Sequence, residues 1–315
     1  MFLARLNLWR NKMLKRTVYF ESAAHLSFRN GQLVYTPKPE GEVRTVPVED
    51  IGFVVLDNHS ITLSMRLIEE LTANNAGIVF CDKFHHPTAM SVPFAGNTTH
   101  AETLAAQLEM SEPLKKNLWK QTVEIKIKNQ AMLLEKTKSG GVGGLRKYAA
   151  SVKSGDPDNR EGAAARIYWQ ELFGDSFRRE RYGDAPNHLL NYAYAILRAA
   201  VARSLVGSGL YPAIGIFHHN KYNAFALADD VMEPYRPYAD EIVFQLWKET
   251  SPEDSDLSKE QKQQLLKLLA ADVHLTNTLR PLMVGLSYTT ASLARCVRGE
   301  QKKIDYPVMK ADQHV

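Results

Sequence analysis

The chain has 315 residues, a formal net charge of +4 and a hydrophobic fraction of 44%, values typical of a folded globular protein and not of a disordered one. No apolar run approaches the roughly 20 residues that a membrane-spanning helix needs, and the basic N-terminal stretch lacks the sustained apolar segment of a secretory signal. The two cysteines, Cys81 and Cys296, lie far apart and outside any zinc-binding spacing. We therefore expect neither a disulfide framework nor a zinc site, and a reducing, cytoplasmic location.

Residues 1–92 have the pattern of a small β-rich domain. From Arg16 onward, short segments with strand-like alternation are separated by turn residues, and Asn30-Gly31 between two of them predicts a hairpin. Between the strand candidates, residues 62–75 have the periodicity of a single amphipathic helix. The turn-rich segment 93–105 is a candidate linker.

Residues 106–315 have helical periodicity almost throughout. Long helices are expected from Leu114 to Met132, from Glu161 to a terminating Gly174, and from Leu190 to Leu205. Three shorter ones are expected at residues 242–247, 258–269 and 282–298. The predicted fold class is α+β with two domains, namely a small β-rich N-terminal domain with one helix and a larger all-α C-terminal domain.

The segment KSGGVGG, residues 138–144, is too glycine-rich to favour regular structure. It lacks the Lys-Ser/Thr ending of a phosphate-binding P-loop and follows no predicted strand. We therefore expect a flexible joint here, not a nucleotide-binding loop.

Positive charge is concentrated between Pro113 and Lys153, where ten Lys and Arg residues stand against two Glu, a local net charge of +8. Such a block can neutralise DNA phosphates and release counterions, although charge alone favours a solvated helix face. The candidate DNA contacts lie in this block and in a second arginine cluster further along. They are Lys115, Lys116, Lys120, Lys126, Lys128, Arg146, Lys147, Arg178, Arg179 and Arg181.

Residues 211–237 concentrate side chains that bind metal ions. His218 and His219 are adjacent, and Asp230 and Glu233 follow them three positions apart, so a helix would place both carboxylates on one face near its first turn. Carboxylate oxygens suit Mg²⁺ and Mn²⁺, and an imidazole shifts the preference toward Mn²⁺.

The same residues have structural explanations. Asp229 and Asp230 can cap a helix, Glu233 can pair with Arg236 one turn later, and His218 can be a buried, hydrogen-bonded histidine. Glu161 starts a helix, where the helix dipole favours a carboxylate. Nothing in the spacing connects it to His218, so these alternatives stay open at the level of residue patterns.

Three motifs in this order resemble the CRISPR-associated integrase of spacer acquisition, the "Cas-one" family. The first is EG-x-x-A-R-x-Y from Glu161, and the second is APNHLLNYAYAIL from Ala185. The third is P-x-x-G-x-x-H at residues 212–218, followed by DVMEPYRP from Asp230. Each motif is weak alone, but their order and spacing are specific, and the β-rich front and helical rear also fit the family. A glutamate as the last acid resembles the type II systems.

The resemblance implies a metal-dependent DNA endonuclease or integrase with Mg²⁺ or Mn²⁺ as cofactor. Its metal ligands correspond to Glu161, His218 and Glu233, and Asp230 to a further catalytic, supporting position; His219 has no firm counterpart. In the implied reaction, the 3′-hydroxyl of a prespacer attacks a phosphodiester at the edge of a CRISPR repeat. The implied partners are DNA, a second copy bound through the β-rich domain, and the small "Cas-two" protein, with no membrane.

Two other functions are compatible with the residue patterns. One is a catalytically silent DNA-binding scaffold of the same fold, against which the complete set of Glu161, His218 and Glu233 argues. The other is a metal-dependent hydrolase of small phosphoesters, which the basic segment disfavours.

Overall fold

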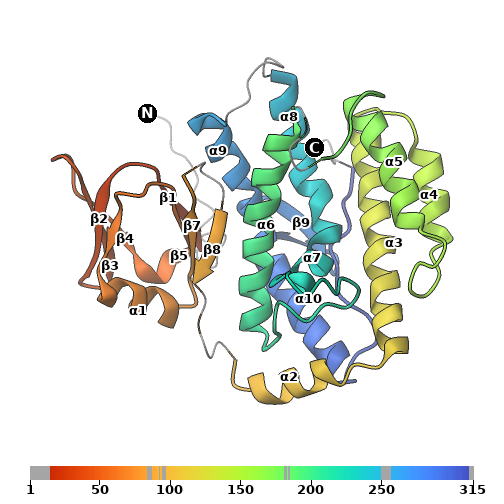
Figure 1. Cartoon of the computed structure of the whole chain (residues 1–315), viewed down its shortest axis with the longest axis horizontal. Coiled ribbons are helices and arrows are strands. Elements are labelled where there is room, and N and C mark those ends of the chain that lie inside the picture. Colours follow the sequence, from red (N-terminus) through yellow and green to blue (C-terminus); the bar gives the residue numbers. More distant parts are fainter. Residues whose placement is uncertain are drawn as a thin grey trace. The chain divides into compact units, whose positions relative to one another are not determined.

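The computed structural model describes residues 15–83, 87–91, 93, 97–180, 183, 185–249 and 257–311. The chain divides into two compact units, Met1–Phe94 and Ala95–Val315, whose elements are labelled in Figure 1. Within the described ranges, no helix is long and apolar enough to cross a membrane.

The first unit contains two four-stranded sheets. One has the order β1-β5-β7-β8, in which β1 (Arg16–Phe20), β5 (Ile51–Leu56) and β7 (Gly77–Cys81) are parallel and β8 (Pro87–Ser91) is antiparallel to β7. The other has the order β4-β3-β2-β6, with β2 (Ala24–Arg29), β3 (Gln32–Pro37), β4 (Arg44–Pro47) and β6 (Thr62–Leu63). The 3-10 turn η1 (Val48–Asp50) and one helix, α1 (Met65–Ala73), complete the described part of this unit.

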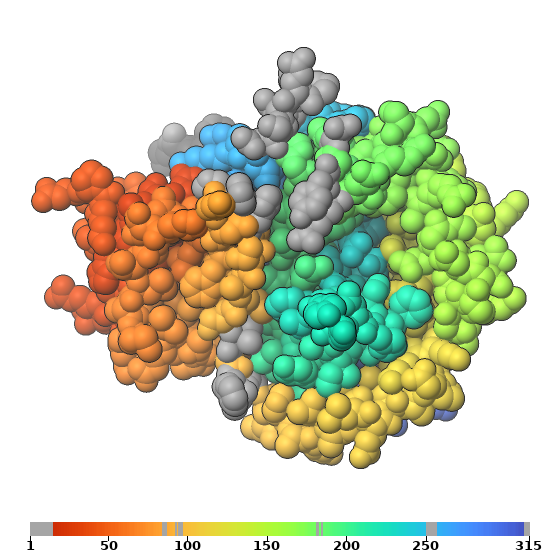
Figure 2. Space-filling view, viewed as in Figure 1, coloured from red at the N-terminus to blue at the C-terminus, as the bar shows by residue number. Residues whose placement is uncertain are grey.

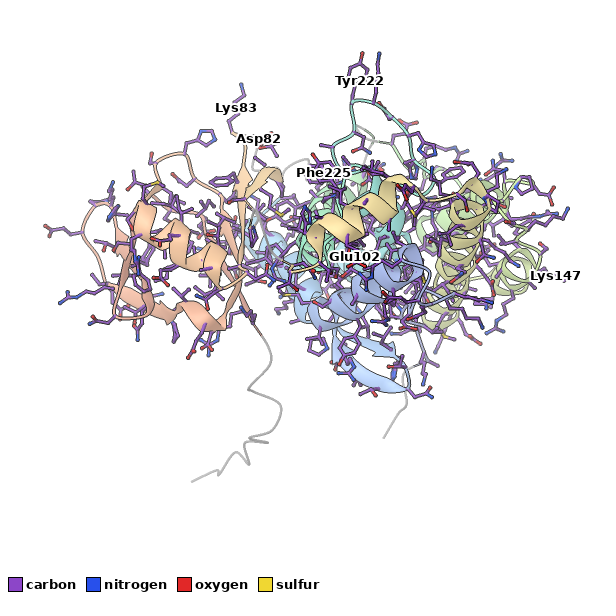
Figure 3. All side chains as sticks on the ribbon, turned by 90° about the horizontal axis from the view of Figure 1, so that it is seen from below. Asp82, Lys83, Glu102, Lys147, Tyr222 and Phe225 are labelled. Atoms are coloured by element: carbon purple, nitrogen blue, oxygen red, sulfur yellow. The ribbon has the colours of Figure 1, made fainter. Side chains whose placement is uncertain are left out.

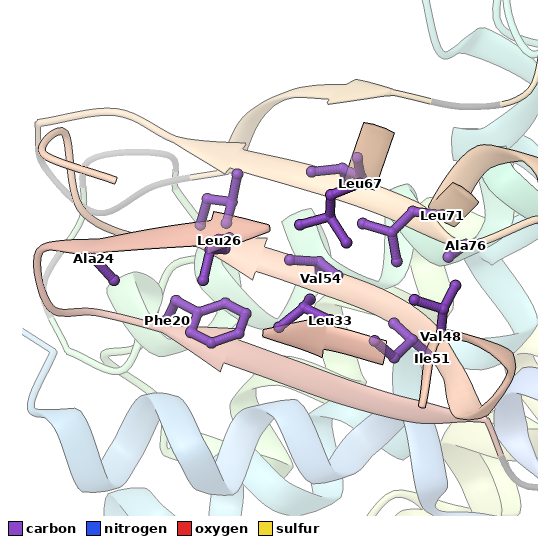
Figure 4. Close-up of a cluster of buried hydrophobic side chains, with 12 residues drawn as sticks. Phe20, Ala24, Leu26, Leu33, Val48, Ile51, Val54, Leu67, Leu71 and Ala76 are labelled. Atoms are coloured by element: carbon purple, nitrogen blue, oxygen red, sulfur yellow. The ribbon is translucent and has the colours of Figure 1, made fainter. Parts of the chain in front are cut away.

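Apolar side chains from both sheets and from α1 form one buried cluster in this unit (Figure 4). Phe20, Leu33 and Leu67 contribute to it from three different elements. The predicted hairpin is present, since Asn30 and Gly31 both have positive φ and connect β2 to β3, as a type I′ turn requires. The expectation of a β-rich front with a single helix is confirmed.

The second unit is built mainly from helices. They are α2 (His100–Leu108), α3 (Glu112–Lys136), α4 (Val142–Ala150), α5 (Arg160–Phe173), α6 (Asn187–Gly207), α7 (Ala226–Met232), α8 (Arg236–Glu249), α9 (Lys259–Leu266) and α10 (Leu282–Val297), with 3-10 turns η2 (Glu233–Tyr235) and η3 (Lys267–Ala270). The segment that we expected to be a linker, 93–105, already enters α2 at His100.

A two-stranded hairpin corrects the expectation that this unit is all-α. Strands β9 (Asp272–Leu275) and β10 (Thr278–Pro281) pair antiparallel, and their turn residues Thr276 and Asn277 both have positive φ. Positive φ at both central positions matches the right-handed twist of a hairpin. The pair Thr-Asn is a weak turn signal compared with Asn-Gly, which explains why the pattern was missed.

The glycine-rich segment is not a joint, because α4 begins within it. Gly141 caps the helix with φ +76°. A Cβ atom added at Gly141 would lie 2.8 Å from the Ile167 side chain, and one added at Gly140 would lie 2.5 Å from the Glu171 carboxylate. Both neighbours belong to α5, so the glycines permit a close approach of this turn to α5.

Helix α3 contacts α4, α5, α7, α8 and η2. Its buried residues therefore include polar ones, among them Thr122, Lys126, Asn129 and Gln130. The solvated helix face that the charge pattern favours does not include Lys126, which is 7% exposed.

Candidate metal centre

Glu161 lies in the first turn of α5, and this turn is fixed by two preceding side chains. Asn159, with φ +48°, accepts a hydrogen bond from the Gly162 amide, and Asp156 accepts hydrogen bonds from the amides of Arg160 and Glu161 at 2.9 and 3.0 Å. Side-chain caps of this kind satisfy amides that have no partner within the helix. The Glu161 backbone is thereby held in one place.

Glu233 lies at the short 3-10 turn between α7 and α8. Pro234 has no amide hydrogen to continue an α-helical ladder, and α3 holds the turn through Asn129. The Asn129 amide donates to the carbonyls of Pro234 and Pro307 at 2.7 and 3.1 Å, while its oxygen accepts from the Met309 amide at 2.9 Å. No sequence motif distinguishes Asn129, since a buried asparagine on a helix has no distinctive spacing.

Lys126 of α3 joins the two glutamates. Its Nζ lies 2.5 Å from Glu161 Oε1 and 2.6 Å from Glu233 Oε2. On the other side, Arg236 Nη2 lies 3.0 Å from Glu233 Oε1, so the alternative of a Glu233–Arg236 pair is also present. Glu161 and Glu233 thus contact the same cation. This cation is the ammonium of Lys126, which we expected on the surface.

The charges of this cluster stabilise one another despite burial. Burial by itself would raise the pKa of Glu233, but Arg236 and Lys126 outweigh it and lower that pKa. Burial would likewise lower the pKa of Lys126, yet Glu233 and Glu161 raise it. Glu233 Oε2 is buried and lies 2.6 Å from the Lys126 ammonium.

His218 is fixed by Asp230, which is fully buried in the second turn of α7. One Asp230 oxygen accepts from the amides of Ile216 and Phe217 at 2.6 and 3.0 Å. The other lies 2.5 Å from His218 Nδ1 and also accepts from the His218 amide at 3.3 Å. These contacts use Nδ1 and leave Nε2 as the nitrogen available to a metal.

The contact with Asp230 favours the protonated form of the His218 imidazole. The side-chain hydrogen bond to Asp230 raises the pKa of His218 and outweighs the partial burial of the ring. Glu233 also raises this pKa through its charge, so His218 lies within electrostatic reach of the glutamate cluster. Asp230 therefore has a supporting position next to His218. Its oxygens contact His218 and the loop amides, whereas those of Glu233 contact Lys126 and Arg236.

Gly215 makes this arrangement possible. A Cβ atom at this position would lie 2.3 Å from the His218 carbonyl oxygen and 2.9 Å from Asp230 Oδ2. Both distances are too short for any side chain. The glycine of the P-x-x-G-x-x-H motif is thus explained by the close approach of the loop to Asp230.

Residues 211–225 form part of the surface of the second unit (Figure 2). Phe217 stacks on Trp119 of α3 with ring centroids 4.3 Å apart, and the Trp119 and His218 rings form a T-shaped pair with centroids 5.8 Å apart. Tyr222 projects from the tip of this segment (Figure 3) and is 83% exposed. An open pocket of about 430 Å³ includes Lys115, His218, the exposed His219 and Tyr222 in its lining.

Asp229 does not belong to the centre. Its carboxylate binds Arg198 Nε at 2.6 Å and Asn223 Nδ2 at 2.7 Å. Helix α7 starts at Ala226, so Asp229 is in its first turn. We expected Asp230 and Glu233 in a first turn, but both lie beyond it.

A buried tyrosine pair lies behind Arg236. Tyr168 and Tyr194 donate hydrogen bonds to the two oxygens of Asp240 at 2.7 and 2.5 Å, and the Arg236 guanidinium lies 4.8 Å from the centre of the Tyr194 ring. Burial raises the pKa of Asp240 to about 6, although both hydroxyl hydrogen bonds lower it. This group supports Arg236 and, through it, Glu233.

The types of side chain at this centre suit a divalent cation, although they do not lie close enough together to form a complete set of ligands. No group of three histidine, cysteine or carboxylate side chains among them is close enough together to hold a metal ion. The two glutamates nevertheless converge on a single positive charge, the Lys126 ammonium. Two carboxylates and an imidazole nitrogen are donors that Mg²⁺ and Mn²⁺ accept.

The predicted DNA contacts on α3 and α4 differ in their surroundings. Lys116, Lys128, Arg146 and Lys147 are exposed, and Figure 3 shows Lys147 at the outside of α4. Three of the basic residues pair with neighbouring glutamates: Lys115 with Glu112 at 3.0 Å, Lys128 with Glu124 at 2.6 Å and Arg146 with Glu135 at 2.6 Å. Lys120 is half-buried, and the described residues contain no ion pair for it.

The second arginine cluster also divides. Arg178 is exposed and donates to the carbonyls of Asp175 and Phe177. Arg179 donates to the side-chain oxygens of Asn187 and Asn191 at 3.0 and 2.8 Å, so the asparagines of the second motif anchor it. Arg181 lies outside the described residues.

Comparison with known sequences identifies the family. The family model described as "CRISPR associated protein Cas1" matches residues 18–276. The chain belongs to the Cas1 family. It is also 39% identical over 258 residues to the CRISPR-associated endonuclease Cas1 of Neisseria meningitidis serogroup C, strain 8013, a match that covers 82% of this chain and 84% of the relative.

Solved structures share the fold of this Cas1 family member. A casposase bound to integration product superposes with a TM-score of 0.78 at 18% identity, covering 95% of this chain and 96% of the casposase chain. A Cas6-RT-Cas1–Cas2 complex matches with a TM-score of 0.69 at 19% identity, covering 92% of this chain and 36% of the longer chain. At these identities the likeness concerns the fold.

Substitution of Gly215 tests how Asp230 holds His218. We expect Gly215→Ala to displace the loop, to break the Nδ1 contact and to lower the pKa of His218 toward its ordinary value of 6.5, with a loss of about 1–3 kcal/mol of stability. An NMR titration of the His218 ring protons measures the shift. Gly143→Ala is the matched control, because an added Cβ there meets nothing within 4 Å. An unchanged His218 pKa in Gly215→Ala would contradict this account.

Asp240 should make stability depend on pH in one direction. Its pKa of about 6 lies above the ordinary 3.8, so its contribution is complete below the ordinary value and is lost as the pH rises through 6. Asparagine mimics the protonated carboxyl. We expect the free energy of unfolding of the wild type, relative to Asp240→Asn, to fall by about 2–3 kcal/mol between pH 4 and pH 7, as measured by urea denaturation. A difference that does not vary with pH would refute the argument.

Proposed function

We propose that this protein is a metal-dependent DNA integrase of CRISPR adaptation. In the proposed reaction, the 3′-hydroxyl of a prespacer attacks a phosphodiester at the edge of a CRISPR repeat and releases a repeat 3′-hydroxyl. The observation that carries the proposal is the convergence of Glu161 and Glu233 on one cation position within electrostatic reach of His218, in a chain of the Cas1 family.

Glu161, Glu233 and His218 through Nε2 would hold Mg²⁺ or Mn²⁺. Such an ion polarises a phosphodiester and lowers the pKa of an attacking hydroxyl. Asp230 would orient His218 and keep its Nδ1 occupied, which is the usual role of a carboxylate behind a metal-binding histidine. Arg236 would fix Glu233 from the side opposite Lys126.

The basic residues of α3 and α4 other than the buried Lys126, together with Arg178 and Arg181, would hold the DNA backbone. Lys116 and Lys147 are exposed and lack an ion pair among the described residues, so phosphates would not have to displace a glutamate there. Lys115, Lys128 and Arg146 would exchange an exposed ion pair for a phosphate, which costs little. Arg179 is held by Asn187 and Asn191, so it is better suited to fix the start of α6 than to bind a phosphate.

The partners follow from the relatives. The casposase is bound to an integration product, and another chain of this fold occurs in a complex with Cas2. We infer that this chain binds prespacer and repeat DNA, associates with a Cas2 protein, and dimerises through its β-rich unit. The cytoplasmic location and the assignment to a type II system remain predictions of the sequence.

Strand transfer tests the proposed chemistry. A short labelled duplex and a plasmid bearing CRISPR repeats are incubated with the protein, its Cas2 partner, and Mg²⁺ or Mn²⁺. We expect Glu161→Ala, His218→Ala and Glu233→Ala each to lower the integration rate by at least about 100-fold, because each removes a proposed ligand. Asp230→Asn should lower it less, since the ligand itself remains.

The alternatives give different results in the same assay. A silent scaffold would bind the duplex without joining it, in every variant alike. A phosphoesterase would cleave p-nitrophenyl phosphate and show little salt-sensitive DNA binding. Unchanged integration in both Glu161→Ala and His218→Ala would refute the assigned site.

Lys120 tests the DNA-binding surface separately from the chemistry. We expect Lys120→Ala to weaken duplex binding about equally for all sequences, and to reduce the slope of log affinity against log salt by about one. Fluorescence anisotropy at several salt concentrations measures both quantities. A loss confined to one DNA sequence would indicate base recognition instead.

A further inference from the structure

The charges of the two proposed glutamate ligands are balanced before any metal binds. Two carboxylates, Glu161 and Glu233, face two permanent cations, Lys126 and Arg236. Glu233 and Lys126 are almost completely buried, with side chains 4% and 9% exposed. A divalent ion entering this cluster would add two positive charges to a group that is already neutral, at a place where water screens poorly.

Lys126 also occupies the space between the ligands. Nζ lies 2.5 Å from Glu161 Oε1 and 2.6 Å from Glu233 Oε2, compared with roughly 2.0–2.1 Å between Mg²⁺ and its oxygen ligands. The ammonium and a metal ion therefore use the same oxygens at nearly the same distance. Both cannot be bound between these two oxygens together.

We propose that Lys126 is an internal competitor of the metal ion, which holds Glu161 and Glu233 together in the metal-free protein and must leave at least one of them when the metal binds. This inference rests on the proposed function, because it assigns the metal to Glu161, His218 and Glu233. It places Lys126 inside the metal centre and not on the exposed DNA-binding surface that its sequence position suggests.

Competition of this kind couples metal binding to DNA binding. A phosphodiester at the centre brings negative charge that offsets the added positive charge of the metal, and a displaced lysine ammonium can bind the phosphate. The metal should consequently bind weakly to the free protein and more tightly in the presence of DNA. By linkage, the metal raises the affinity for DNA by the same factor.

Calorimetric titration with Mn²⁺ of the full-length, DNA-free protein tests the competition directly. Lys126→Met keeps the length of the side chain and removes its charge, and we expect it to bind Mn²⁺ at least about tenfold more tightly than the wild type. Lys126→Arg, which keeps the charge, should bind it as weakly as the wild type. Equal Mn²⁺ affinity of Lys126→Met and the wild type would overturn the proposal.

Lys136→Met is the matched control. Lys136 is the last residue of the same helix and pairs with Glu241 of α8, away from the proposed ligands. Its substitution should leave the Mn²⁺ affinity unchanged. An equal gain of affinity in Lys136→Met would show that general loss of positive charge is responsible, and would overturn the role of Lys126.

Further variants distinguish a failure of this inference from a failure of the proposed function. Glu161→Ala and His218→Ala, each combined with Lys126→Met, should abolish the tight Mn²⁺ binding. If tight binding persists in both double variants, the metal lies elsewhere and the proposed site itself fails. If single Glu161→Ala and His218→Ala substitutions weaken binding while Lys126→Met has no effect, the site stands and only the competition is wrong.

The wild-type protein supplies a measurement that does not depend on how a variant folds. Reductive methylation followed by mass spectrometry reports the accessibility of each lysine ammonium. We expect Lys126 to be protected without metal and to react faster at saturating Mn²⁺, while Lys136 stays unchanged. A Lys126 reactivity that Mn²⁺ does not alter would contradict its displacement.

A DNA duplex with dideoxy 3′ ends, which cannot attack, tests the coupling. We expect this duplex to increase the Mn²⁺ affinity of the wild type by about tenfold or more, and that of Lys126→Met by clearly less. Equal increases in both proteins would show that Lys126 does not mediate the coupling.

Discussion

The contact of one lysine with two glutamates connects the elements of the helical unit. Lys126 comes from α3, Glu161 from the first turn of α5, and Glu233 from the turn between α7 and α8. Removing one partner from a buried ion pair costs about 3–5 kcal/mol, because it leaves an uncompensated charge. These three elements are therefore held at one point by charge, and the arrangement of the centre depends on that point.

Support for this point comes from outside the candidate ligands. Asn129 fixes the backbone next to Glu233, Asp156 and Asn159 fix the start of α5, and Asp230 fixes His218. Each uses hydrogen bonds to backbone groups or to a ring nitrogen, so each restricts a direction as well as a distance. The positions of the candidate ligands are thus determined by their neighbours and not by the Lys126 contact alone.

Much of the fold follows from local patterns. Alternation and Asn30-Gly31 predict the hairpin of the first unit because turn geometry is a property of a few adjacent residues. Helical periodicity predicts α5, α6 and α10 to within a few residues. The failures at α4 and at the β9–β10 hairpin have a common cause, since tertiary packing and strand pairing decided both. The glycines at 140 and 141 serve a close approach to α5, and Thr276 takes a positive φ that its own propensity does not favour.

The sequence by itself determined the family, through the order of three motifs, and thereby named Glu161, His218 and Glu233 as the residues to examine. Only the tertiary structure decided that Asp230 holds the imidazole, that Asp229 belongs to Arg198, and that Lys126 lies between the glutamates. Periodicity assigns a face to a residue only when one side of a helix meets solvent. Helix α3 is contacted by several other elements, so its lysine at position 126 is buried with carboxylates that are distant in sequence, and no local pattern contains that contact.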